Sequence, residues 1–204
     1  MASVLTNLLI NGAGGITVGG TGIGTKYFPT VPGASIGVAS TNNGYLLIPA
    51  NNAVNGQRLA VRATGNFAVG DITGACPTVT IGLYPVTFTG GLSTASIGAT
   101  AIISQVSTLQ ANINALYPWA LNVDLSGDTG SGLVQALAGS IVCDGVAGSF
   151  SAALVTGLTK INFAPGSTLP ASGQVAPFGL VVGVTFSISE AGNTANMYQF
   201  DLSN

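Results

Sequence analysis

The chain has 204 residues, of which 47% are hydrophobic and only 5% are charged, and its formal net charge is −2. A typical soluble protein has roughly 25% charged residues. Four Lys and Arg residues cannot neutralise a run of phosphates, so we expect no nucleic-acid partner. Histidine is absent, which removes the commonest metal ligand and general base, and we expect no metal and no other cofactor. No run of about 18 apolar residues occurs, so we expect no membrane-spanning helix and no membrane partner.

The first 35 residues are rich in glycine, with Gly at seven positions between 12 and 24. Glycine loses more backbone entropy on ordering than any other residue, so this segment is not expected to form a helix. We expect an extended N-terminal arm over 1–35, ordered only where something packs on it, and a folded domain over 36–204. The first ten residues carry no positive side chain, and we expect no signal peptide.

Beyond residue 36, apolar and polar residues alternate over short stretches that turn residues separate. This period of two is typical of a strand with one buried face. The clearest alternations predict strands at 58–64, 78–84, 119–125, 178–188 and 197–202. Weaker patterns predict further strands at 44–49, 133–143, 149–156 and 159–163.

Strands of this number and spacing predict an all-β fold, an antiparallel β-sandwich of the jelly-roll kind that carries the glycine-rich arm. One segment departs from the pattern. Ile103, Val106 and Leu109 recur at helical spacing and predict a short helix near 103–114. Trp119 alternates with other apolar residues, which favours a place in the core over a sugar-binding face.

Short motifs suggest catalysis, but their surroundings do not support it. The run 128–131, Asp-Thr-Gly-Ser, spells the aspartic-protease signature, yet a polar turn precedes it and no second copy occurs. Asp124, Asp128 and Asp144 are candidates for a calcium site or a glycosidase pair, although the calcium-loop spacing is absent. Cys76 has no histidine to activate it. We expect no enzyme and no catalytic residue, with a hydrolase that uses Asp128 as the alternative from that class.

Several segments carry a resemblance to a known group of proteins. They are Arg62-Ala63-Thr64-Gly65-Asn66-Phe67, Tyr117-Pro118-Trp119-Ala120-Leu121, Leu125-Ser126-Gly127-Asp128 with Ser131-Gly132, Pro177 through Ser187, and Tyr198-Gln199-Phe200. Over about residues 57–203, the chain resembles structural proteins of tailed bacteriophages. The shared segments are strand-and-turn patterns, so no functional residue is carried over. The resemblance implies a virion component, such as a capsid decoration (cement) protein.

From this resemblance, the low charge and the arm, we expect a non-enzymatic protein that decorates and stabilises a phage capsid. Its expected partners are the major capsid protein and its own copies, with a homotrimer favoured. Its expected place is the capsid surface of the virion, after synthesis in the host cytoplasm. An interface between identical copies is more stable when few long charged side chains must lose their water on binding. The candidate subunit contacts lie in the arm: Leu5, Leu8, Ile10, Tyr27 and Phe28.

The alternative function is a tail or fibre component that binds a carbohydrate or a tail partner. A tail-tube protein and a major shell protein are further structural alternatives. The sequence also leaves open the host, the symmetry axis, the strand order, and whether Cys76 and Cys143 are bonded.

Overall fold

The computed structural model describes residues 4–9, 16–19, 24–28, 46–48, 58–70, 77–89, 94–98, 100–109, 116–128, 133–144, 150–154, 159–161, 178–190 and 192–203. These residues form fourteen β-strands in two antiparallel sheets, and no helix occurs among them. Accordingly, no helix that could span a membrane is found in the described ranges.

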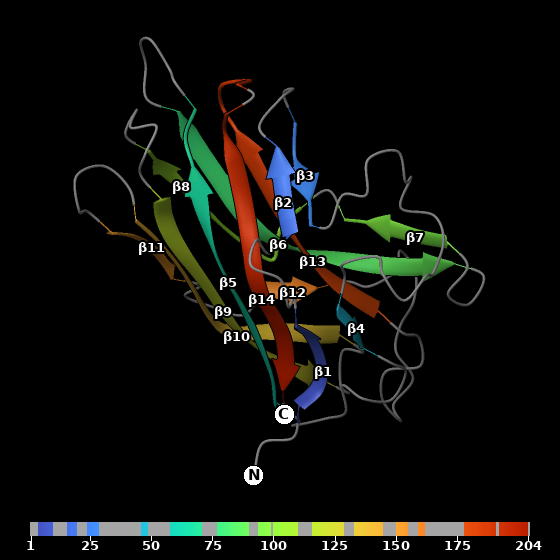
Figure 1. Ribbon diagram of the computed structural model, residues 1–204. Helices are drawn as coiled ribbons and strands as arrows, with labels where there is room; N and C mark the ends of the chain where they lie inside the picture. The colour runs from blue at the N-terminus through green and yellow to red at the C-terminus, as the bar shows by residue number, and fades with distance from the viewer. Residues whose placement is uncertain are drawn as a thin grey trace.

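The larger sheet has eight strands. They are β1 (Val4–Leu9), β2 (Ile16–Gly19), β5 (Arg58–Ala68), β9 (Leu116–Asp128), β10 (Leu133–Asp144), β11 (Phe150–Leu154), β12 (Thr159–Ile161) and β14 (Thr194–Ser203). Its long strands follow one another in the order β14-β5-β9-β10, and β14, β5 and β9 run side by side in Figure 1. β1 and β2 pair with β14, while β11 and β12 pair with β10, so short strands flank both long outer strands.

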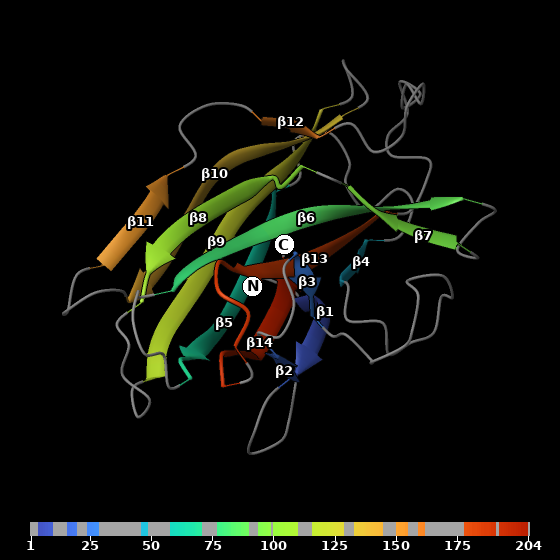
Figure 2. The same ribbon diagram turned by 90° about the horizontal axis from the view of Figure 1, so that it is seen from above.

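The smaller sheet has six strands. They are β3 (Lys26–Tyr27), β4 (Leu46–Ile48), β6 (Thr78–Thr89), β7 (Thr94–Ile97), β8 (Ile103–Thr108) and β13 (Phe178–Phe186). Strands β13 and β6 form its centre, with β3 and β4 beside β13 and with β7 and β8 beside β6. Figure 2 shows β6 between β8 and β13. Short flanking strands leave little continuous edge for pairing with another chain.

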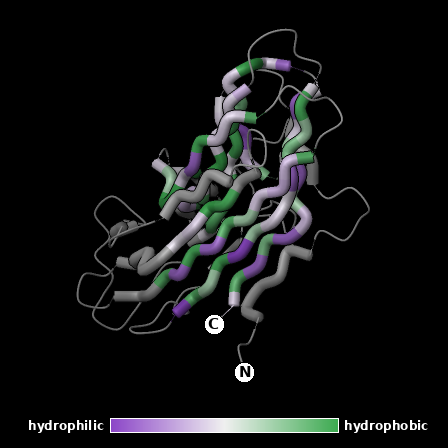
Figure 3. Tube along the Cα trace, turned by 90° about the vertical axis from the view of Figure 1, so that its left-hand side faces the viewer, coloured by the Kyte–Doolittle hydropathy of each residue, from purple (hydrophilic) through white to green (hydrophobic). Residues whose placement is uncertain are grey.

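Alternating burial explains why these segments form a two-layered fold. On β5, Leu59, Val61 and Ala63 are buried between the sheets, whereas Arg58 and Arg62 are exposed on the outer side. Figure 3 shows the same alternation as hydrophobic and hydrophilic segments that follow one another along the long strands. Each of the nine predicted strands is present, with bounds shifted by a few residues. The structure confirms an all-β, jelly-roll-like sandwich of two antiparallel sheets.

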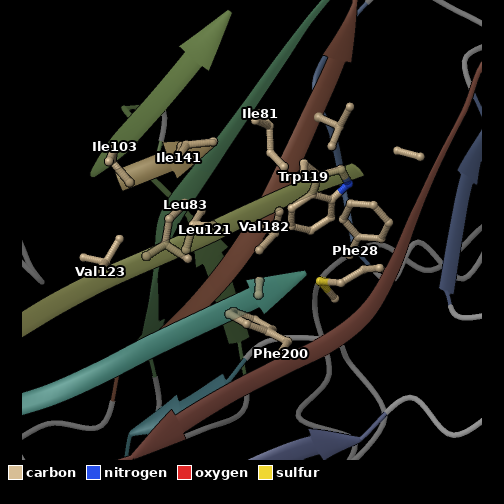
Figure 4. Close-up of a cluster of buried hydrophobic side chains, with 14 of the residues drawn as sticks. Phe28, Ile81, Leu83, Ile103, Trp119, Leu121, Val123, Ile141, Val182 and Phe200 are labelled. Carbon is tan, nitrogen blue, oxygen red and sulfur yellow. The ribbon is translucent and has the colours of Figure 1, made fainter. Parts of the chain in front are cut away.

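The hydrophobic core lies between the two sheets. Ile81, Leu83 and Val182 of the smaller sheet and Leu121 and Val123 of the larger sheet are at most 2% exposed and belong to one cluster (Figure 4). Burying a side chain of this size stabilises a fold by about 1.5–3 kcal/mol. The facing apolar rows therefore hold the layers together.

Trp119 is 3% exposed, which confirms that it belongs to the core. Its ring stacks on Phe67 at a centroid separation of 6.0 Å and lies 6.4 Å from the ring of Phe28. Gly65 is the cross-strand partner of Trp119. A Cβ at Gly65 would lie 2.5 Å from Trp119 Cζ2 and 1.9 Å from the carbonyl oxygen of Asn196, so only glycine fits beneath the indole.

The segment 1–35 was expected to form an extended arm, and its described parts pair with strands of the two sheets. β1 pairs with β14, β2 pairs with β14, and β3 pairs with β13. Phe28 follows β3, its N–H donates to the carbonyl of Val182 at 2.9 Å, and its side chain is fully buried in the core. Glycines disfavour a helix, but they permit a short strand whose backbone groups pair with a neighbouring strand.

The helix expected near 103–114 is wrong for residues 103–108, which form β8 and pair with β6. Ile103 and Ser107 are buried, whereas Val106 is 55% exposed on the other side of the strand. Apolar residues spaced three apart therefore do not share one buried face in this segment. β-Branched residues and strand pairing stabilise the extended form here. Residues 110–115 lie outside the described ranges.

Phe28→Ala is expected to lower the free energy of unfolding by about 3–5 kcal/mol, because it leaves a cavity in the core. Urea unfolding followed by the fluorescence of Trp119 measures this loss. Val106→Ala, which truncates an exposed side chain, serves as the control and is expected to cost less than about 1 kcal/mol. Wild-type stability of Phe28→Ala would show that this residue is not part of the core.

Gly65→Ala is expected to lower the free energy of unfolding by more than about 2 kcal/mol, because a backbone oxygen and the Trp119 indole would both have to move. Thermal unfolding followed by circular dichroism measures the effect. Gly139→Ala on β10 is the matched control, since its nearest contact is the flexible end of Ile103 at 3.2 Å. Equal stability of the two variants would contradict the close packing of the indole on β5.

Candidate interaction surfaces

The three carboxylates considered for catalysis or calcium binding lie far apart in the larger sheet. Asp128, the last residue of β9, is paired with Leu133 at the start of β10, and Asp144 is the last residue of β10. At about 3.3 Å per residue, Asp128 and Asp144 are about 35 Å apart along the strand. Asp124 pairs with Ala138, about 20 Å from Asp144 by the same measure. Glycosidase carboxyls lie about 5–10 Å apart, so neither pair across the hairpin fits.

The β9–β10 hairpin also changes how the run 128–131 is interpreted. A polar turn was expected just before this run, but β9 continues through Ser126 and Gly127 to Asp128, and only residues 129–132 of the connection lie outside the described ranges. Asp124 is four residues earlier on β9, about 13 Å away along the strand. Asp128 thus ends an extended strand in the larger sheet.

Asp124 takes part in an ion pair on the outer side of the larger sheet. Arg58 Nη2 donates to Asp124 Oδ2 at 2.8 Å, and the two side chains are 66% and 38% exposed. A pair this exposed stabilises a fold by about 1 kcal/mol or less. Within the ranges that the structure describes, no group of three Asp, Glu, Cys or His side chains is placed to hold a metal. Cys143 pairs across the sheet with Trp119, and Cys76 lies outside the described ranges.

The outer side of the larger sheet carries both signs of charge. Arg62 lies opposite Asp201 on β14 and opposite Asn122 on β9. Gln199 donates from its amide to the carboxylate of Asp201. We call this surface the charged face. Its defining residues are Arg58, Arg62, Asn122, Asp124, Gln199 and Asp201.

An exposed tyrosine lies beside the charged face. The register of β14 shifts between Met197 and Gln199, so Tyr198 sits at a bulge and is 39% exposed. Asn66 Nδ2 donates to the Tyr198 hydroxyl at 2.7 Å, and Asn196 Nδ2 donates to Asn66 Oδ1 at 2.9 Å. These amides hold the hydroxyl end of the ring in place.

The outer side of the smaller sheet has a different character. Val79, Ile81 and Leu83 of β6 are buried between the layers, so alternation places Thr78 and Thr80 on the outer side. The neighbouring strands add hydroxyl residues and one exposed valine, and no charged residue, to this side. We call it the uncharged face. Its defining residues are Thr25, Thr78, Thr80, Ser104, Val106, Thr108, Thr185 and Ser187.

Several polar groups of the uncharged face bind one another. The hydroxyls of Thr25 and Thr185 share a hydrogen bond of 2.8 Å. The hydroxyl of Ser187 accepts from the backbone N–H of Thr78 at 2.8 Å, and the N–H of Ser187 donates to the carbonyl of Thr78 at 2.9 Å. Polar groups that already have hydrogen-bond partners within the protein lose fewer hydrogen bonds when water is removed. This lowers the free-energy cost of covering the surface with another protein.

A tyrosine pair lies at one end of the uncharged face. The rings of Tyr27 and Tyr84 meet edge to face with centroids 5.2 Å apart. A Cβ at Gly183 would lie 2.7 Å from Tyr84 and 2.9 Å from Tyr27, so both rings rest on the glycine backbone of β13. Burial of its ring raises the pKa of Tyr27 above 10.0, and the neighbouring Tyr84 raises that pKa further.

The five residues predicted as subunit contacts have different surroundings. The side chain of Phe28 is fully buried in the core of its own chain. Tyr27 is half-buried beside the uncharged face. Leu5 and Leu8 lie on β1, where Leu8 is opposite Phe200, while Ile10 lies outside the described ranges. Tyr27 and Phe28 thus differ in burial, and the five candidate contacts stay a prediction.

The uncharged face was not found from the sequence. Val106 is its one exposed aliphatic residue, and the sequence placed it on an expected helix. The run Thr78, Thr80, Gly82 on β6 carried a usable signal, because its polar positions contain hydroxyls and no charge. Only the pairing of β6 with β8 and β13 shows that these positions form one surface.

Comparisons with known proteins add no family. No protein-family profile and no curated protein matches the chain. Among solved structures, the chain is similar to a Lotus tetragonolobus seed lectin, with 10% identity and a TM-score of 0.32 over 95% of this chain and 94% of that one. It is also similar to an endo-1,3-beta-glucanase from Streptomyces sioyaensis, with 11% identity and a TM-score of 0.32 over 99% of this chain and 96% of that one. At these TM-scores neither likeness bears on the function of this chain.

The raised pKa of Tyr27 predicts a loss of stability in alkali. The unfolded chain releases this proton near pH 10, whereas the folded chain holds it to higher pH. The contribution is fully present below pH 10 and is lost as pH rises through the folded-state pKa. Between pH 9 and pH 11, urea unfolding is expected to show a smaller fall in stability for Tyr27→Phe than for wild type. An identical fall in both proteins would contradict the burial of this hydroxyl.

Proposed function

We propose that this chain is a non-enzymatic structural protein of a bacteriophage virion that decorates and stabilises the capsid shell. It binds the major capsid protein and its own copies, as a trimer, at the outer surface of the capsid. The resemblance of residues 57–203 to tailed-phage structural proteins supports the class of protein. The uncharged face is the observation that carries the role, because it is a surface suited to burial against another protein.

The physical case for a protein partner rests on the cost of removing water. Interface centres are depleted of charged residues, since long charged side chains lose hydration and rotamer freedom when covered. The uncharged face has no such side chain among its described residues, and Val106 exposes methyl groups on it. By contrast, the ion pair of Arg58 and Asp124 keeps the charged face suited to water.

The second candidate is a tail or fibre component that binds a carbohydrate. Tyr198 favours it, because an exposed ring whose hydroxyl is held by Asn66 has the shape to stack on a sugar ring. This component is present in few copies per particle, whereas a decoration protein is present in many copies. Copy number therefore separates the two candidates.

The test is the number of copies of this chain per purified particle, measured by quantitative mass spectrometry against the major capsid protein. Particles are prepared from the phage or prophage that encodes the chain. Hundreds of copies in a simple ratio to the shell subunit are expected. A dozen or fewer would favour the tail component, and absence from purified particles would overturn both virion roles.

A further inference from the structure

We infer that the uncharged face is the surface through which each copy docks on the shell, so that the charged face points away from the particle. This inference rests on the proposed function and names the surface that performs it. Its residues differ from the five predicted contacts of the N-terminal segment, of which Phe28 is buried inside its own chain.

The first support is geometric. Val106, Thr80 and Thr185 form one row across β8, β6 and β13, and the row continues through the hydroxyl bond from Thr185 to Thr25. A second row begins with Thr108 opposite Thr78 and continues to Ser187. β-Branched and small side chains fill both rows, so the surface has no long side chain to fold away before a flat partner can contact it.

The second support is the cost of covering this surface. Asp, Glu, Lys and Arg are absent from the defining residues of the uncharged face, and hydrogen bonds already join Thr25 to Thr185 and Ser187 to Thr78. The partner would also cover exposed methyl groups, including those of Val106, which is 55% exposed. Covering the charged face would instead take water from Arg58, which is 66% exposed.

The third support is the size of the surface, which favours the shell over a second copy. Four strands about 4.8 Å apart, with about five residues along the longer ones at about 3.3 Å, span about 300 Å². A stable pair of proteins in solution buries about 800 Å² on each partner. One uncharged face is therefore too small to hold two copies together. Several copies joined in one oligomer can engage a repeating shell at once, and their contacts then reinforce one another.

Charge substitutions on the two faces test this inference in the full-length protein. Val106→Asp and Thr108→Asp each place a carboxylate on the uncharged face at an exposed position. Leu116→Asp is the matched control, because Leu116 is 61% exposed on the outer side of the larger sheet. Val106→Thr keeps the shape and adds no charge. Urea unfolding checks that every variant folds as wild type does.

Binding is measured by co-sedimentation with particles that lack this protein, and oligomeric state by analytical ultracentrifugation. We expect Val106→Asp and Thr108→Asp to reduce the bound copies at least tenfold without changing oligomeric state. Val106→Thr and Leu116→Asp should bind within about twofold of wild type.

Two outcomes contradict the inference while wild type still binds and the proposed function stands. In one, both aspartate variants of the uncharged face bind as wild type does. In the other, Val106→Asp dissociates the oligomer, which would make this face a contact between copies. If wild-type protein itself fails to bind such particles, the proposed function and the inference fall together.

Discussion

The packing of the two sheets against each other is the constraint on which the rest of the structure depends. The long strands β5 and β9 bury alternate side chains over much of their described length, and Trp119 closes the space between the layers by lying on the bare backbone of Gly65. Because most of the buried hydrophobic side chains lie between the sheets, the outer sides are free to differ from each other. With so few charged residues in the chain, their placement decides what each outer side can bind.

The two outer sides differ in what it costs to cover them. Arg62 and Asp201 face each other across neighbouring strands of the larger sheet, where water solvates them at no cost to the fold. The smaller sheet presents threonine, serine and Val106, with several hydroxyls bound to one another or to the backbone. A protein bound in many copies benefits from such a surface, since each contact gains from apolar burial and little is lost in desolvating charge.

Strands with one buried face could be predicted because their period of two appears directly in the sequence. Leu59, Val61 and Ala63 on β5 and the core position of Trp119 are examples. The short strands β1 to β3 could not be predicted in this way. They contain only two to six residues, too few for a clear period, and pairing with β14 and β13 decides their conformation.

The segment 103–108 shows why a spacing of three can mislead. Ile103 is buried and Val106 is exposed, so the two apolar residues lie on opposite sides of β8. The uncharged face could not be predicted from the sequence, for a related reason. Its residues lie on or directly beside β3, β6, β8 and β13, and only the strand order brings these strands together.

Electron cryomicroscopy of the intact particle tests the central claim most directly. A decoration protein predicts sandwich-shaped density outside the shell at every equivalent position, with the smaller sheet toward the major capsid protein and the charged face toward solvent. Density found only at the tail, or a bound sandwich with its larger sheet against the shell, would contradict the account.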